Sequence, residues 1–162
     1  MKVGKKHTRM KWVTRRGIHV NRTATAWFVR RFLDPRAEIL FVEPEEVAAV
    51  QEREQAIGFD APEATYPHRD DRGRCSFEAL IAEKLPGDEA LARLGKIVHG
   101  ADFPAEMDLT RESAGLWAIS QGFTEVGKDD SEILDRASFL YDSLYAHLRH
   151  FVRDEATDRR IR

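Results

Sequence analysis

The chain has 162 residues, 42% of them hydrophobic and 33% charged, with a formal net charge of −2. No apolar run approaches the roughly 20 residues of a transmembrane helix, and no apolar stretch follows the basic N-terminus as it would in a signal peptide. The single cysteine excludes an internal disulfide framework and fits a reducing compartment. We therefore expect a cytoplasmic, soluble protein without a membrane partner.

Charge is distributed unevenly along the chain. Residues 1–36 carry eleven Lys or Arg and one acid, which gives +10, whereas residues 37–162 carry fifteen Lys or Arg and 27 acids, which gives −12. Residues 1–11 have little to bury and are expected to form a disordered basic arm. We expect one domain over residues 12–152, followed by a charged tail over residues 153–162.

The first elements form a strand–helix–strand unit. Residues 11–20 have a strand pattern that Gly17 interrupts. Asn21 is a candidate N-cap for a helix over residues 22–33, whose apolar side carries Phe28 and Phe32 and leaves Thr23 and Trp27 opposite. Asp34 precedes a proline and should end that helix. A second strand follows over residues 37–42.

The remainder of the chain is predicted to be mostly helical. A helix is expected over residues 44–55 and a short strand over 56–60, followed by a long loop over 61–75 that is rich in Pro, Asp, Arg and Gly. Further helices are expected over residues 76–85 (capped by Ser76), 88–99 (capped by Asp88 and closed by Gly100) and 110–121 (capped by Thr110), and from residue 130 onward. The predicted fold is α+β, a helix-rich single domain with a small sheet near the N-terminus.

A cluster of cationic side chains surrounds the first predicted helix. Guanidinium groups beside a helix N-terminus match an oxyanion or a phosphate group. The alternative is that these arginines make ordinary ion pairs with the acidic remainder of the chain. The candidate anion ligands are Arg15, Arg16, Arg22, Arg30 and Arg31, with His19 tuning the site.

Other side chains are of the types that bind divalent transition metals. His68 and Cys75 belong to the long loop, and His99 and Asp102 lie at the end of a predicted helix. Two plainer explanations stay open: Cys75 as a small buried residue, and His99 as a complement to a helix dipole. The candidate metal ligands are His19, His68, His99, Asp102, Cys75 and Glu112.

Several of these segments together resemble one family, the C-terminal domain of the chromate resistance protein ChrB. The resemblance spans roughly residues 12–148 and is strongest over residues 12–35. Its further blocks are Gly58-Phe-Asp60, His68, Cys75-Ser-Phe-Glu78, Ile97-Val-His-Gly-Ala-Asp102, Glu112-Ser-Ala-Gly-Leu116 and Tyr141-Asp-Ser-Leu-Tyr145.

The resemblance implies a cytoplasmic bacterial protein linked to chromate resistance. Longer members of this family carry an additional N-terminal domain and are thought to govern induction of a chromate efflux transporter. A DNA-binding role is therefore not carried over, and we do not expect this domain alone to bind nucleic acid. At residue 21 the family is expected to favour Asp where this chain has Asn, which would weaken a metal site there.

Three functions follow from these observations. The first is a chromate- or oxyanion-responsive binding domain of a stress-response system. The second is a metal-binding domain or metalloenzyme that uses a divalent transition metal ion on a small anionic substrate. The third is a partner-binding module, in which the basic segment docks on the acidic body of a second copy in a homodimer.

Overall fold

A small parallel sheet lies at the N-terminal end of the chain. The computed structural model describes residues 9–161. Strands β1 (Lys11–Arg15), β2 (Glu38–Val42) and β3 (Ile57–Gly58) pair in parallel in the order β2-β1-β3. The predicted arm lies outside the described residues over 1–8, and its last residue, Lys11, begins β1.

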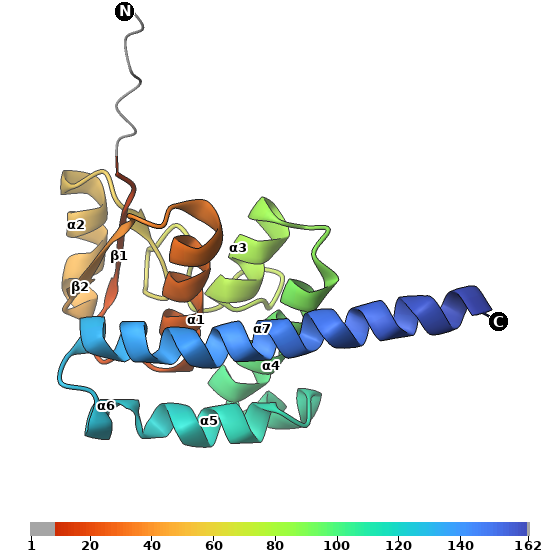
Figure 1. The fold of residues 1–162 in the computed structure, drawn as a ribbon. Helices are drawn as coiled ribbons and strands as arrows, with labels where there is room; N and C mark the ends of the chain where they lie inside the picture. The colour runs from red at the N-terminus through yellow and green to blue at the C-terminus, as the bar shows by residue number, and fades with distance from the viewer. Residues whose placement is uncertain (1–8, 162) are drawn as a thin grey trace, which may run out of the picture.

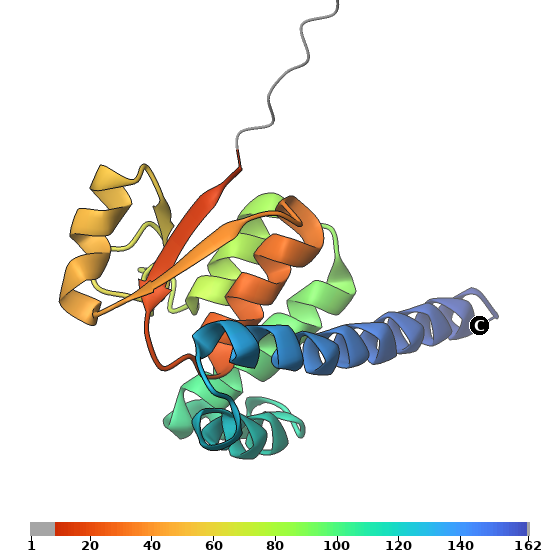
Figure 2. The same ribbon diagram turned by 60° about the vertical axis from the view of Figure 1, so that its left-hand side comes forward.

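Helices cover both faces of this sheet and build the rest of the domain. Helix α2 lies against one face, while α1 and α3 lie on the other side and the long α7 runs past them (Figures 1 and 2). Within the described residues, no helix has both the length and the apolar character that a bilayer span requires. The helices are α1 (Val20–Phe28), α2 (Val47–Arg53), α3 (Ser76–Lys84), α4 (Glu89–Asp102), α5 (Ser113–Gln121), α6 (Phe123–Val126) and α7 (Asp130–Ile161), with a π-helical turn at Val29–Leu33 and 3-10 segments at Pro44–Glu46 and Pro104–Leu109.

The sheet separates two apolar clusters because successive side chains of a strand point to opposite faces. Trp12 belongs to the main core between the sheet, α1 and the later helices. Val13 belongs to a smaller cluster with Val47 and Val50 of α2. The predicted α+β, helix-rich fold with a small N-terminal sheet is confirmed.

Helix α1 is buried on almost every side. Each of its residues except Arg22 is buried. The prediction of a single apolar side is therefore wrong, since Thr23 and Trp27 pack against α7. Their polar atoms are satisfied there: the Thr23 hydroxyl lies 2.6 Å from the Tyr141 hydroxyl, and the Trp27 indole N–H donates to Asp142 at 3.0 Å. A helix covered all round is a central element of the core.

Asn21 does not cap the helix in which it lies. Helix α1 begins at Val20, so Asn21 is inside its first turn. The Asn21 side chain instead reaches α3, where its Oδ1 accepts from the Phe77 backbone N–H at 3.3 Å and from the Ser76 hydroxyl at 3.1 Å. The predicted cap was wrong because the free backbone N–H that the Asn21 side chain satisfies belongs to a different helix.

Two other predicted boundaries also differ. Helix α4 starts after its predicted cap, Asp88, whose carboxylate accepts from the Leu91 N–H at 2.8 Å, but it continues past Gly100 to Asp102. Gly100 serves close packing rather than termination: a Cβ there would lie 2.4 Å from the Ser113 Oγ of α5. The predicted charged tail is the last part of α7, as far as Ile161.

Candidate functional site

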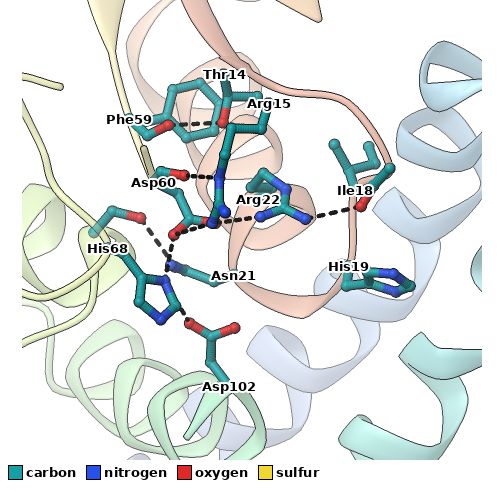
Figure 3. Close-up of polar contacts among 12 residues, drawn as sticks. Thr14, Arg15, Ile18, His19, Asn21, Arg22, Phe59, Asp60, His68 and Asp102 are labelled. Carbon is teal, nitrogen blue, oxygen red and sulfur yellow. Dashed lines mark hydrogen bonds and ion pairs between the residues drawn. The ribbon is translucent and has the colours of Figure 1, made fainter. Parts of the chain in front are cut away.

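A buried carboxylate gathers three cationic side chains at the end of the sheet. Asp60 follows β3 in a left-handed backbone conformation (φ 50°), and its side chain is 1% exposed. The Arg22 guanidinium donates to Asp60 Oδ2 at 3.0 Å, and His68 Nδ1 lies 2.6 Å from Asp60 Oδ1. Arg15 lies 3.5 Å from the same Oδ1 and also donates to the Asp60 carbonyl at 2.7 Å (Figure 3).

Local backbone geometry explains why Asp60 stands beside β1. The Phe59 N–H donates to the Val13 carbonyl, and the Thr14 hydroxyl donates to the Phe59 carbonyl at 2.7 Å (Figure 3). Gly58 permits close packing, since a Cβ there would lie 2.1 Å from the Gln51 side-chain oxygen that accepts its N–H. The chain is thereby fixed on both sides of the turn that presents the carboxylate.

His68 and Asp102 complete this cluster from the long loop and from the last residue of α4. His68 Nδ1 lies 3.5 Å from Asp102 Oδ2. The hydrogen bond to Asp60 raises the pKa of His68. Burial, reinforced by the neighbouring charge of Asp60, raises the pKa of Asp102 to about 6. At neutral pH the cluster thus favours a protonated imidazole between two carboxyl groups.

A cavity of about 250 Å³ opens beside the cluster. Asn21 Nδ2, Arg22 Nε and Asp102 Oδ2 are buried there without a hydrogen-bond partner among the described residues. The orientation of the Asn21 amide is fixed, because the Phe77 N–H can only donate and therefore requires Oδ1. The cavity is lined by His19, Val20, Asn21, Arg22, Asp60, Ala101, Asp102, Pro104, Trp117 and Gln121.

His19 stands at the same cavity but makes no contact with the carboxylates of the cluster. Its Nδ1 lies 2.9 Å from the Ser120 carbonyl, which can only accept, so Nδ1 carries the proton. This bond leaves Nε2 as the ring atom available to a ligand.

The five predicted arginines do not converge on one point. Arg15 and Arg22 meet at Asp60. The other three arginines form ordinary ion pairs with acidic side chains elsewhere, which is the alternative stated above. None of these three lines the cavity. The pairs are Arg16 with Glu43 at 3.4 Å, Arg30 with Asp135 at 3.2 Å and Arg31 with Asp142 at 3.4 Å.

Four of the six predicted metal ligands fall into two separate clusters of the described residues, and His19 and Glu112 belong to neither. His68 and Asp102 share one with Asp60, and Cys75 and His99 share the other with Glu78; in each, one ligand atom per residue lies within 4.8 Å of the others. Glu112 is exposed and belongs to neither cluster of the described residues. The rings of His68 and His99 contact the Phe103 ring, with centroids 4.9 and 4.7 Å away.

Sequence reasoning missed Asp60 and Glu78. A signal for each was present. Asp60 ends a predicted strand, where side chains at a sheet edge commonly act, and Glu78 stands three residues after Cys75 at a helix start, the spacing of a capping box.

Comparisons with known proteins place this architecture in a family. The model of the ChrB C-terminal domain matches residues 12–148, so the chain belongs to that family, which its sequence resembles. Protein ChrB of Cupriavidus metallidurans is 39% identical over 137 residues, which cover 84% of this chain. The matched region spans only 40% of that relative. No solved structure matches.

Proposed function

We propose that this chain is an oxyanion-binding domain of a chromate resistance protein, with the anion held in the cavity beside Asp60. Membership of the ChrB family supports the link to chromate resistance. The observation that carries the anion site is the presence of two unpaired, buried N–H donors, Asn21 Nδ2 and Arg22 Nε, on residues that line one cavity. Buried donors without partners are costly, and an oxyanion is the ligand type that satisfies several at once.

The charge around the cavity supports the same ligand. Arg15, Arg22 and His68 contact Asp60, and His68 also lies 3.5 Å from Asp102, so three cationic groups face two carboxyl groups. Asp60 partly neutralises the two guanidinium groups and fixes their direction, which reduces the cost of holding them in a largely buried position. An entering anion would supply the remaining negative charge.

Asp102 gives the cavity a carboxyl group that can either accept a hydrogen bond from an anion or donate one to it. Because the pKa of Asp102 is raised to about 6, its carboxyl group can exchange a proton with a ligand near neutral pH. Its unpaired Oδ2 can accept from the hydroxyl of a hydrogen oxyanion or, when protonated, donate to an oxygen of the fully ionised form. At about 30 Å³ per water, the 250 Å³ cavity has room for a tetrahedral oxyanion with several waters.

Of the five predicted arginines, the proposal uses Arg22 as an anion contact and Arg15 only as its neighbour at Asp60. It is tested by calorimetric titration of chromate and sulfate into the wild type, Arg22→Lys and the control Arg30→Lys. Lysine keeps the charge but lacks the guanidinium Nε–H, so we expect Arg22→Lys to weaken binding at least about tenfold, the effect of one charge-assisted hydrogen bond. Arg30→Lys should bind like the wild type. No heat with either anion, or loss of binding only in Arg30→Lys, would overturn the proposal.

A second variant separates the cavity from the fold. Asn21→Asp retains the oxygen that caps α3 but replaces the unpaired amide donor by a carboxylate oxygen. We expect it to stay folded by circular dichroism and to lose chromate and sulfate binding through charge repulsion. Since we expect the family to favour Asp at residue 21, this anion site would be a feature of chains with Asn there. Anion binding equal to that of the wild type would show that Asn21 is not a contact.

One observation favours a metal ion at the same place as a second candidate function. Asp60, His68 and Asp102 offer ligand atoms of suitable type within 4.8 Å of one another. Two arginines already occupy Asp60, however, and would repel a cation. Metal analysis after chelator-free purification decides between them: a stoichiometric transition metal that is lost in His68→Asn and unaffected by sulfate would favour the metal site.

A further inference from the structure

The second cluster, formed by Cys75, Glu78 and His99, lies between α3 and α4 and has a different chemistry from the cavity beside Asp60. Cys75 is fully buried, and the side chain of His99 is 9% exposed. Sulfur, carboxylate oxygen and imidazole nitrogen come within 4.8 Å of one another. No arginine contacts Cys75 or Glu78 among the described ion pairs and hydrogen bonds.

The start of α3 places two of these ligands. Cys75 is the N-cap residue, its sulfur accepts from the Glu78 N–H, and the Glu78 carboxylate returns to accept from the Cys75 N–H at 3.0 Å. This reciprocal capping box brings the thiol and the carboxylate together over one turn. The same Glu78 Oε2 lies 2.6 Å from His99 Nδ1.

His99 is oriented as a metal ligand usually is. Its Nδ1 faces Glu78, while its Nε2 lies 2.8 Å from Glu106 Oε2. Glu106 is held in turn by the Arg69 guanidinium, which donates to its two oxygens at 2.9 and 3.1 Å. Metal-bound histidines characteristically donate their second ring N–H to a carboxylate, which fixes the tautomer and makes the first nitrogen a stronger ligand.

We infer that Cys75, Glu78 and His99 form a binding site for a divalent transition metal of the zinc type, with Glu106 positioning His99. The metal would take the thiolate sulfur, a Glu78 oxygen and His99 Nδ1, and solvent would complete a tetrahedral shell. A thiolate with an imidazole selects zinc and cobalt over magnesium or calcium. Binding requires the thiolate form of Cys75 and a free lone pair on His99 Nδ1, so the thiol proton and any proton on that nitrogen leave to solvent.

The surroundings provide both rigidity and an entrance. Gly95, one turn before His99 on α4, lets the helices approach closely, since a Cβ there would lie 3.1 Å from the Cγ of Glu78. A cleft of about 260 Å³, lined by Arg74, Glu78, Gly95 and Lys96 among others, leads to the Glu78 side chain, which is 20% exposed. A metal ion would thus enter past Glu78 and meet the buried sulfur behind it.

The test is a titration of the full chain with Co²⁺, followed by absorption spectroscopy. The wild type should bind about one equivalent with a thiolate-to-cobalt charge-transfer band and the visible bands of tetrahedral cobalt. The charge-transfer band should disappear in Cys75→Ser and persist in His147→Gln, which removes an exposed histidine of α7. Absence of the band from the wild type overturns the inference even if a variant fails to fold.

One further variant distinguishes a positioning role for Glu106 from a ligand role, and a second serves as a control at the other cluster. Glu106→Gln should keep the charge-transfer band but weaken Co²⁺ binding by about 10–100-fold, as loss of an outer carboxylate does. His68→Asn should leave both the band and the affinity unchanged, because His68 belongs to the cluster on the other side of Phe103. A band that survives in Cys75→Ser, or cobalt bound only through His68, would contradict the site.

Discussion

Two histidines contact the same aromatic ring and stand in opposite electrostatic surroundings. His68 shares Asp60 with two arginines beside a cavity, whereas His99 lies between the carboxylates of Glu78 and Glu106 next to a buried thiol. Two guanidinium groups contact the carboxylate that His68 shares, whereas two carboxylates and a thiol surround His99. The comparison teaches that a histidine's neighbours, not its residue type, decide whether a site suits an anion or a cation.

The largest expected effect is a loss of folding stability when Asp60 is replaced. Asp60→Asn leaves two arginines without their buried counter-charge, and removal of one member of a buried ion pair costs about 3–5 kcal/mol. We expect urea unfolding to show a loss of that order. The matched change Glu78→Gln, at a more exposed carboxylate, should cost clearly less. Equal losses would mean that Asp60 is no more important to the fold than Glu78.

The second effect is a pH-dependent gain in folding stability when Asp102 is replaced by Asn. The pKa of Asp102 rises from its ordinary value of 3.8 to about 6 in the folded chain. The folded state therefore holds this proton more tightly, so the stabilisation is full below pH 3.8 and is lost as the pH rises through 6. Asp102→Asn should consequently stabilise the ligand-free protein above pH 6, by on the order of 2 kcal/mol.

Denaturation curves at pH 4 and pH 8 check this expectation. The difference between Asp102→Asn and the wild type should be small at pH 4 and large at pH 8. A difference that does not change with pH would mean that burial of the Asp102 carboxyl does not govern its titration.

A smaller effect, on anion affinity, is expected when His19 at the edge of the cavity is replaced. His19→Gln retains a donor toward the Ser120 carbonyl but removes the available ring nitrogen. If the bound anion reaches His19, chromate affinity should fall by about threefold to tenfold, the value of one net hydrogen bond. Calorimetric titration measures this change, and cobalt binding serves as the control that should not respond.

The smallest effects are expected from the arginines outside the cavity. Arg16 and Arg31 are more than half exposed, and their ion pairs span 3.4 Å. Exposed pairs of this kind contribute about 0–1 kcal/mol. Arg16→Ala and Arg31→Ala should therefore change neither the thermal midpoint by more than a few degrees nor the anion affinity. A tenfold loss of affinity in either would return the anion site to the wider arginine set.

Local sequence signals predicted much of the fold. The Asp88 cap and the strand–helix–strand unit follow from patterns within a few residues. The predicted Ser76 cap of α3 is wrong by one residue, because Cys75 is the N-cap. Asn21 failed as a cap of α1 because its hydrogen-bond donors, the Phe77 N–H and the Ser76 hydroxyl, come from α3, more than 50 residues later. No local pattern specifies a hydrogen bond of that range.

The candidate sites were predictable only in part. His68, Cys75, His99 and Asp102 were identifiable by residue type, but their division into two clusters depends on how the long loop and α4 pack around Phe103. The sequence shows that the arginines are positively charged, but it does not show which carboxylate each of them contacts. Sequence gives the inventory of reactive groups, and tertiary contacts decide which of them face one another.

Anomalous diffraction from crystals soaked in chromate and, separately, in Co²⁺ tests most directly that the two clusters differ in the charge of their ligand. The predicted result is a chromium peak in the cavity beside Asn21 and Arg22, and a cobalt peak bound by the sulfur of Cys75 and the ring of His99. Cobalt at Asp60, His68 and Asp102 with no chromium in the cavity would contradict the assignment of both sites.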